Sequence, residues 1–166
     1  MGFIKSIVNF LADICYLLII AYVLVCAPMV FRFKPLVVLS GSMEPTFKVG
    51  SIIYTRDCKQ DEIDVGDIIT FKLDDDTYVS HRVHSIDENG LYETKGDAND
   101  SPDPKKLSYD DIVGKDMNIM IPYIGYYIQF VNNHMHLVIV VVVILVLEFL
   151  LSNLGIFNIN NKRKEK

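Results

Sequence analysis

The chain has 166 residues, 51% of them hydrophobic, with 16 Lys and Arg against 21 Asp and Glu. The resulting net charge of −5 argues against a nucleic-acid-binding protein, because phosphate backbones attract basic surfaces. Three cysteines without a CxxC spacing argue against a disulfide framework and against a zinc site built on thiolates. The length allows one ordinary domain, but the hydrophobic residues are concentrated near the two ends of the chain.

The first apolar run, residues 14–31, contains 18 residues without a charge. A helix needs roughly 20 such residues to cross the hydrocarbon core of a bilayer. The run is long for a cleaved signal peptide, and Arg32 and Lys34 follow it without a small-x-small cleavage site. We therefore expect residues 1–34 to form a retained N-terminal membrane anchor.

A second apolar run covers residues 136–157 and is interrupted only by Glu148. Because an acidic side chain within a span is costly, we favour a transmembrane segment (126–158) that begins near Gly125 and leaves Glu148 close to the cytoplasmic interface. The basic tail, residues 159–166, is typical of a cytoplasmic end. Two spans and a cytoplasmic tail predict that both termini are cytoplasmic and that the residues between the spans are extracytoplasmic.

The segment between the spans, residues 35–125, is acidic and alternates short β-like runs with turn sequences. The pair Asn89-Gly90, for example, favours a type I′ hairpin turn. No helical period is visible, so we predict a mainly β fold: a small antiparallel, barrel-like or coiled β domain between an N-terminal and a C-terminal transmembrane helix. The predicted strands cover residues 35–39, 51–56, 67–73, 78–86 and 90–96.

The turn-like segment "LSGSMEPTF" contains Ser42, whose hydroxyl becomes a useful nucleophile only beside a base. Strand alternation places His81 with Val79 and Val83 on the core side. An imidazole has an unperturbed pKa near 6.5 and is largely a free base at neutral pH, whereas a lysine, near 10.4, needs strong desolvation. His81 is therefore the favoured base, and Lys72 is its competitor.

A catalytic histidine also needs a group that orients it through its second ring nitrogen. The loop "TKGDANDSPD" offers three acidic candidates, Asp97, Asp100 and Asp103. Sequence spacing alone does not rank them.

The other histidines are expected to have no catalytic role. Alternation turns His84 toward the opposite face of its strand. His134 and His136 lie at a membrane boundary, and no third or fourth metal ligand accompanies them. The sequence therefore predicts neither a metal site nor a cofactor.

The segments "SGSMEPT", "VGDIITF", "SHRV" and "TKGDAND", in this order behind an N-terminal anchor, resemble the sequence boxes of type I signal peptidases. The resemblance covers about residues 36–125, and "IPYIGY" resembles the segment that closes the family's domain. Bacterial-type relatives place a general-base lysine before an arginine in the third box, whereas this chain has His81-Arg82. The resemblance therefore points to the endoplasmic reticulum and archaeal branch of the family, the Ser-His-Asp type.

This resemblance implies a role for each matching residue. Ser42 matches the family's nucleophile, and His81 matches its general base. Asp103 matches the aspartate that completes the site, while Asp97 matches a second acidic position with a supporting role. Ser40 matches a hydroxyl that stabilises the oxyanion together with the backbone N–H of Ser42.

The resemblance implies a membrane-bound serine endopeptidase that cleaves signal peptides from secretory precursors after small residues, at sites such as Ala-x-Ala. Its expected partners are signal peptides, the lipid bilayer, and secretion machinery or other subunits. Low Arg content and richness in Asn, Ile and Lys favour a cell membrane over the endoplasmic reticulum. Two alternatives remain: a non-catalytic, membrane-tethered β module that binds a partner in a secretion or surface-assembly complex, and a peptidase whose base is Lys72.

Overall fold

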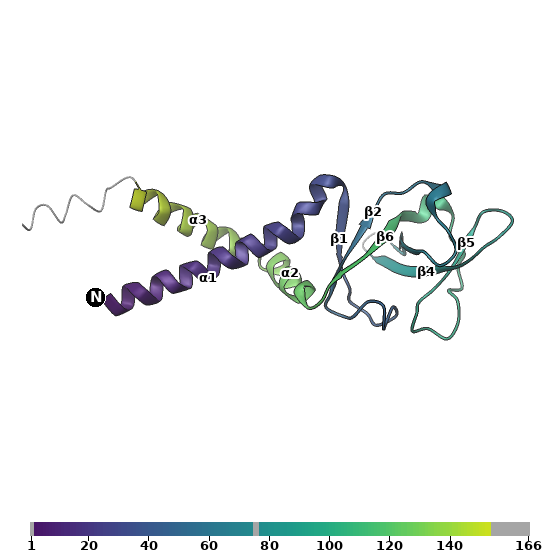
Figure 1. Cartoon of the computed structure of the whole chain (residues 1–166), viewed down its shortest axis with the longest axis horizontal. Coiled ribbons are helices and arrows are strands. Elements are labelled where there is room, and N and C mark those ends of the chain that lie inside the picture. The colour runs from purple at the N-terminus through teal and green to yellow at the C-terminus, as the bar shows by residue number, and fades with distance from the viewer. Residues whose placement is uncertain (1, 75–76, 154–166) are drawn as a thin grey trace, which may run out of the picture. The chain divides into compact units, whose positions relative to one another are not determined.

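The structure is a computed structural model that describes residues 2–74 and 77–153 (Figure 1). The basic tail, residues 159–166, lies outside the described residues. Its predicted cytoplasmic position therefore stays a prediction.

The chain divides into two compact units. One unit, Ile20–Gln129, contains the whole β-sheet. The other combines Met1–Ile19 with Phe130–Lys166, and its described part is helical. The β unit carries the candidate site, and each unit is described by itself below.

The N-terminal helix α1, Gly2–Cys26, is followed by a short 3₁₀ helix, Ala27–Phe31. The stretch Ser6–Phe31 is long and apolar enough to cross a membrane. Arg32 ends it in the left-handed region, with φ of 65°. The predicted N-terminal apolar helix is confirmed.

The C-terminal part forms two helices, α2 (Ile124–Asn133) and α3 (Met135–Asn153). They meet at a break with a bend of 88°. The predicted transmembrane segment from near Gly125 stays a prediction. Together the two helices are apolar and long enough for a second span. At the break, Nδ1 of the His134 ring donates to the carbonyl oxygen of Phe130 at 2.9 Å. A side chain that inserts into the hydrogen-bond ladder of a helix is a known cause of kinks.

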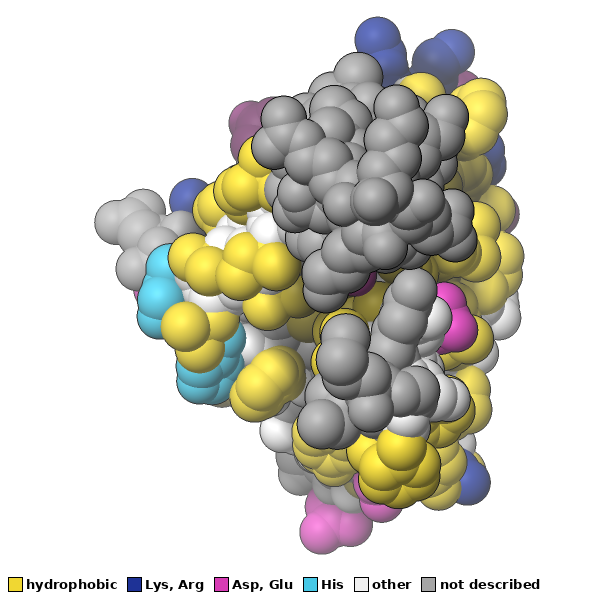
Figure 2. Space-filling view, turned by 90° about the vertical axis from the view of Figure 1, so that its left-hand side faces the viewer, with side chains coloured by type: hydrophobic (Ala, Val, Ile, Leu, Met, Phe, Trp, Pro, Cys, Tyr) yellow, Lys and Arg dark blue, Asp and Glu magenta, His cyan; other side chains and the backbone are white. Residues whose placement is uncertain are grey.

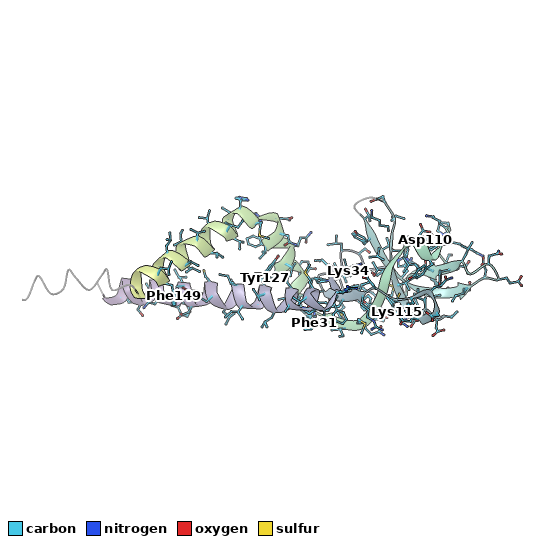
Figure 3. All side chains as sticks on the ribbon, turned by 90° about the horizontal axis from the view of Figure 1, so that it is seen from above. Phe31, Lys34, Asp110, Lys115, Tyr127 and Phe149 are labelled. Carbon is cyan, nitrogen blue, oxygen red and sulfur yellow. The ribbon has the colours of Figure 1, made fainter. Side chains whose placement is uncertain are left out.

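Large hydrophobic side chains on the outside of α1 and α3 are exposed. Leu17 and Leu24 are each 67% exposed on α1, and Phe149 is 62% exposed on α3. Figure 3 shows side chains projecting outward along both helices, and hydrophobic side chains make up much of the described surface in Figure 2. Because hydrocarbon solvates such side chains and water does not, this surface fits helices in a membrane.

The β unit contains one antiparallel sheet in the order β1-β2-β6-β3-β4-β5. Its first and last strands are edges, so the sheet is antiparallel as predicted but is not a closed barrel. The first predicted strand is displaced by two residues, and the next four overlap the observed ones closely. The strands are β1 (Phe33–Val37), β2 (Ile52–Arg56), β3 (Ile68–Lys72), β4 (Tyr78–Ile86), β5 (Tyr92–Lys95) and β6 (Ile112–Ile121).

Strand β6 was not predicted, although it lies in the sheet between β2 and β3. Its sequence, "IVGKDMNIMI", contains residues with weak strand preference, including Gly114, Asp116 and Asn118. Asn118 has a positive φ of 54°, and the pairing of β6 with β2 shifts register between Ile53 and Thr55. These irregularities hide the period of two from which strands are recognised.

The strand β4 follows the predicted alternation. His81 and Val83 are 7% and 1% exposed, whereas His84 is exposed. Val83 belongs to a buried cluster with Ile69 and Phe71, and the ring of Phe71 meets that of His81 edge to face, with centroids 6.2 Å apart. The histidine is therefore held by packing on the core side of the sheet.

Candidate active site

Ser42 lies in the loop between β1 and β2, where buried neighbours fix the turn. Met43 and Phe47 are 3% and 2% exposed and pack with Ile53 and Ile68. The N–H of Phe47 donates to the carbonyl of Met43 at 2.9 Å, which closes the turn. The apolar residues after the serine thus anchor the segment, while the serine itself stays at its surface.

The hydroxyl of Ser42 lies beside the imidazole of His81. The distance from Ser42 Oγ to His81 Nε2 is 3.1 Å, and the distance from His81 Nδ1 to Asp103 Oδ2 is 2.6 Å. A carboxylate accepts a hydrogen bond from a ring N–H, so Nδ1 carries the hydrogen and Nε2 is left to accept a hydrogen bond from the serine hydroxyl. Three residues that are distant in the sequence therefore form one continuous hydrogen-bonded chain.

Asp103 is itself held in place by β5. Thr94 Oγ1 donates to Asp103 Oδ2 at 2.6 Å, and the N–H of Asp103 donates to the carbonyl oxygen of Thr94 at 2.7 Å. The geometry separates the three aspartates that sequence spacing left unranked: Asp103 contacts His81, Asp97 binds elsewhere, and Asp100 is exposed.

Asp97 forms a two-point ion pair with Arg82. Arg82 Nε and Nη2 lie 2.9 and 2.7 Å from the two carboxylate oxygens, and Thr46 also donates to Asp97. The Arg82 hydrogen bonds lower the pKa of the Asp97 carboxyl, which burial alone would raise. Because Thr46 belongs to the serine loop, Asp97 ties that loop to β4.

A second connection joins the loop that contains Ser42 directly to the loop that contains Asp97. The N–H of Ala98 donates to the carbonyl oxygen of Ser42 at 2.9 Å. A Cβ on Gly96 would lie 2.6 Å from the same oxygen, so a residue with a side chain would push the two loops apart. Glycine is needed at this position for close approach of the two backbones.

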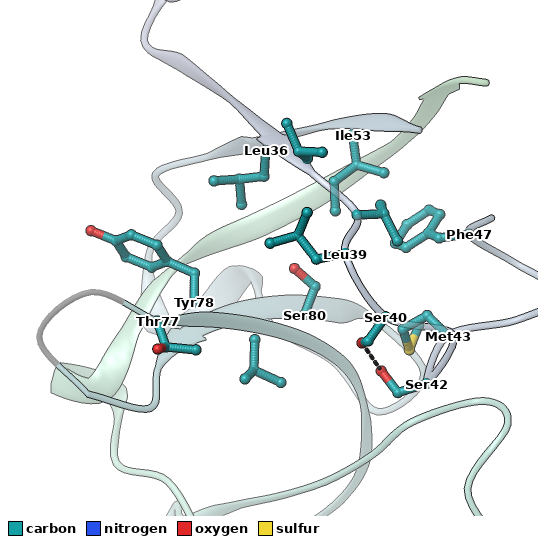
Figure 4. Close-up of a pocket in the computed structure, with 13 residues that line it drawn as sticks. Leu36, Leu39, Ser40, Ser42, Met43, Phe47, Ile53, Thr77, Tyr78 and Ser80 are labelled. Atoms are coloured by element: carbon teal, nitrogen blue, oxygen red, sulfur yellow. Dashed lines mark hydrogen bonds between the residues drawn. The ribbon is translucent and has the colours of Figure 1, made fainter. Parts of the chain in front are cut away.

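Ser40 and Lys72, the other residues singled out from the sequence, differ in their relation to Ser42. Ser40 Oγ lies 3.4 Å from Ser42 Oγ, at the long end of the hydrogen-bond range (Figure 4). In the β3–β4 register, His81 faces Ile69, so alternation places Lys72 on the opposite face of β3. Of the two candidate bases, His81 is therefore the one that contacts the serine.

A pocket of about 310 Å³ opens beside Ser42. Residues that follow β1 and residues at the start of β4 line it from two sides (Figure 4). Its walls are mostly apolar, and the hydroxyl-bearing residues that line it are Ser40, Ser42, Thr77, Tyr78 and Ser80. An extended chain that lies between these two segments would place one of its side chains next to the serine.

Sequence reasoning missed several supporting residues. Thr94 positions Asp103, and Thr46 and Arg82 hold Asp97. The alternation of β5 carries a signal for Thr94, since it faces inward with Tyr92 and both are at most 2% exposed. No local sequence pattern indicates the role of Thr46, because its partner Asp97 is 51 residues away.

Comparison with known proteins places the chain beside signal peptidases. The family model described as "Signal peptidase, peptidase S26" matches residues 11–101. "Signal peptidase I W" of Bacillus subtilis (strain 168) is 37% identical over 134 residues, which cover 74% of this chain and 67% of that protein.

Two eukaryotic relatives match a shorter part of the chain. "Signal peptidase complex catalytic subunit SEC11C" of Homo sapiens is 37% identical over 101 residues, and the SEC11 subunit of Lodderomyces elongisporus is 42% identical over 104 residues. Each match covers 54% of this chain, and the chain spans 52% and 60% of these two proteins.

Proposed function

This chain belongs to the signal peptidase family, peptidase S26, and we propose that it is a serine endopeptidase of the Ser-His-Asp type. Membership makes it a membrane-bound peptidase that cleaves signal peptides. The observation that carries the serine-type proposal is the hydrogen-bonded chain from Ser42 Oγ through His81 to Asp103, with distances of 3.1 and 2.6 Å.

In the first half of the reaction, Ser42 Oγ attacks the carbonyl carbon of the scissile bond while His81 Nε2 takes its proton. Asp103 stabilises the imidazolium that forms. The backbone N–H of Ser42 and the hydroxyl of Ser40 donate to the oxyanion of the tetrahedral intermediate. His81 then protonates the leaving amine, which leaves an acyl-enzyme on Ser42.

In the second half, a water molecule attacks the acyl carbon and His81 again accepts the proton. Collapse of the second tetrahedral intermediate returns the proton to Ser42 Oγ and releases the signal peptide. Asp97 has a supporting part in both halves, because its bonds to Arg82 and Thr46 hold the serine loop against β4.

The proposed substrates carry small residues, often Ala, at the first and third positions before the cut. The pocket beside Ser42 supports an uncharged side chain at this point of the substrate, since its walls are mostly apolar. The substrate is expected to lie extended between the segment after β1 and the start of β4.

The proposed setting is a cell membrane, with the β unit extracytoplasmic and both termini cytoplasmic. The apolar stretch Ser6–Phe31 and the basic tail of the sequence support this orientation. Since two relatives are named catalytic subunits of a signal peptidase complex, other subunits are proposed partners of this chain too.

Cleavage of a precursor with an Ala-x-Ala site by the detergent-solubilised chain tests the proposal. We expect Ser42→Ala to abolish cleavage, by about 10⁴-fold or more, with an unchanged circular dichroism spectrum. Ser85→Ala is a matched control, because it removes a serine from β4 that bonds Glu93 away from His81. Cleavage that survives Ser42→Ala would contradict the proposal and favour a binding module.

A further inference from the structure

A second polar array lies on the face of β4 opposite His81. Thr55 Oγ1 on β2 is 2.8 Å from Thr70 Oγ1 on β3, which is 2.8 Å from Ser80 Oγ on β4. Thr55 and Thr70 are 0% exposed, whereas Ser80 is half-buried and lines the pocket beside Ser42. A row of neutral hydroxyls therefore leads from the sealed interior to the pocket.

Gly114 on β6 allows this contact across the sheet. Strand β6 lies between β2 and β3, and Gly114 is the register partner of Thr70. A Cβ at Gly114 would lie 2.8 Å from Thr55 Cγ2 and 2.2 Å from the carbonyl oxygen of Arg56. Any larger residue would displace β2 and separate the two threonine hydroxyls.

The buried end of the row fixes the direction of its hydrogen bonds. Each hydroxyl has one proton to donate, and among the described residues Thr70 is the one hydrogen-bond partner of the Thr55 hydroxyl. Asp116 is the register partner of Thr55, but its Oδ1 accepts from the N–H of Asn118 and its Oδ2 has no partner among the described residues. A buried donor left unpaired is costly, so Thr55 donates to Thr70.

Thr70 is also completely buried, so its proton goes to Ser80, the remaining member of the row. The Ser80 hydroxyl then accepts a hydrogen bond from Thr70, and its own proton is free to bond a further acceptor. Figure 4 shows the Ser80 side chain pointing into the pocket, toward Leu39. A hydroxyl donor with a fixed supporting partner thus faces a pocket with mostly apolar walls.

We propose that Ser80 is a specificity-determining residue that donates a hydrogen bond to a serine side chain in the substrate residue immediately before the cut. The inference rests on the proposed function, which places that residue's side chain in the pocket beside Ser42. An alanine there leaves the Ser80 proton without a substrate partner, whereas a serine supplies an acceptor of nearly the same size. The site is therefore built to accept Ser as well as Ala.

Three precursors that differ only at this residue, with Ala, Ser or Cys, test the proposal. For the wild type we expect kcat/KM for the Ser precursor to equal that for Ala and to exceed that for Cys, a poor acceptor, by about fivefold. Ser80→Ala should still cleave the Ala precursor and lower the Ser-to-Ala ratio by about fivefold. Thr77→Val is the matched control, since it removes another pocket hydroxyl and should leave the ratio unchanged.

An unchanged Ser-to-Ala ratio in Ser80→Ala overturns the proposal, and so does equal cleavage of the Ser and Cys precursors by the wild type. The comparison of the Ser and Cys precursors uses the wild type alone, so it tests the proposal even if Ser80→Ala folds poorly. Binding of the same peptides to Ser42→Ala, with and without Ser80→Ala, gives the ratio independently of cleavage. Absence of any cleavage by the wild type would instead overturn the proposed function.

Discussion

Neighbouring residues of β4 belong to two polar arrays of different kinds. His81 faces one side of the sheet and joins an ionisable array with Asp103, whereas Ser80 faces the other side and joins a row of neutral hydroxyls. An imidazole can accept and release a proton while a neighbouring carboxylate stabilises its charged form, but serine and threonine hydroxyls cannot act in this way. Only the first array is therefore suited to proton transfer, and the second is suited to presenting a fixed donor.

The two arrays also differ in how burial is compensated. In the ionisable array every close contact joins a donor to a carboxylate or to a ring nitrogen, and Thr94 adds a further donor. In the neutral array the donors follow one another in a single direction. The proposed base, His81, and the proposed specificity residue, Ser80, are therefore adjacent in the sequence and lie on opposite faces of the sheet.

The largest expected effect breaks the ionisable array at its base. His81→Ala should lower kcat/KM for an Ala-x-Ala precursor by about 10⁴-fold, because the serine loses its proton acceptor. Lys72→Ala should leave cleavage within a few-fold, since alternation places Lys72 on the other face of β3. Both variants are measured on the same precursor, and folding is checked by circular dichroism. An inactive Lys72→Ala beside an active His81→Ala would reverse the assignment of the base.

A smaller effect concerns Asp116, which lies opposite Thr55 at the end of the neutral array. The residue is 4% exposed, and burial raises the pKa of its carboxyl from 3.8 to about 6. Because the folded pKa is the higher one, ionisation costs stability as the pH rises through about 6, and the cost is absent below 3.8. Asp116→Asn should therefore raise the free energy of unfolding by about 1–3 kcal/mol at pH 8 and hardly at pH 4.

Urea unfolding of the detergent-solubilised chain at the two pH values measures this difference. Asp110→Asn, on an exposed carboxylate before β6, is the control and should change stability little at either pH. If Asp116→Asn raised the free energy of unfolding equally at pH 8 and pH 4, burial would not raise the pKa of this carboxyl.

The smallest expected effect concerns Asp97, which supports the ionisable array without contacting its base. Arg82 holds the pKa of Asp97 below its ordinary value, so the pair adds stability above about pH 4 and this stability is lost as the pH falls through the folded pKa. Arg82 is 36% exposed, which screens the interaction. Asp97→Asn should therefore cost about 1 kcal/mol at pH 7.

The unfolding free energies of Asp97→Asn and of Asp100→Asn, at pH 7 and at pH 3, give the measurement. Asp100 lies in the same loop but is exposed, so its variant is the matched control. Equal losses in both variants would mean that the ion pair with Arg82 does not stabilise the loop.

Much of the fold followed from local patterns in the sequence. The charge-free run from residue 14 predicted the apolar helix α1, and alternation placed His81 on the buried face of β4. Strand β6 was missed because Gly114 and Asp116 interrupt its apolar pattern, yet Gly114 is what lets Thr55 and Thr70 meet. A residue that is needed for a tertiary contact thus interrupts the alternation of apolar and polar residues by which its strand would be recognised.

The sequence by itself determined which side chains were candidates, because the boxes around Ser42 and His81 are contiguous and the period of a strand is local. Their catalytic roles stay predictions, but the structure brings them within hydrogen-bonding distance. Only the tertiary structure decided that Asp103, and neither Asp97 nor Asp100, reaches the imidazole, since three aspartates in one loop look alike until β5 fixes the path of the loop. The hydroxyl row that ends at Ser80 was equally invisible, because its members lie on three strands and meet only through sheet register.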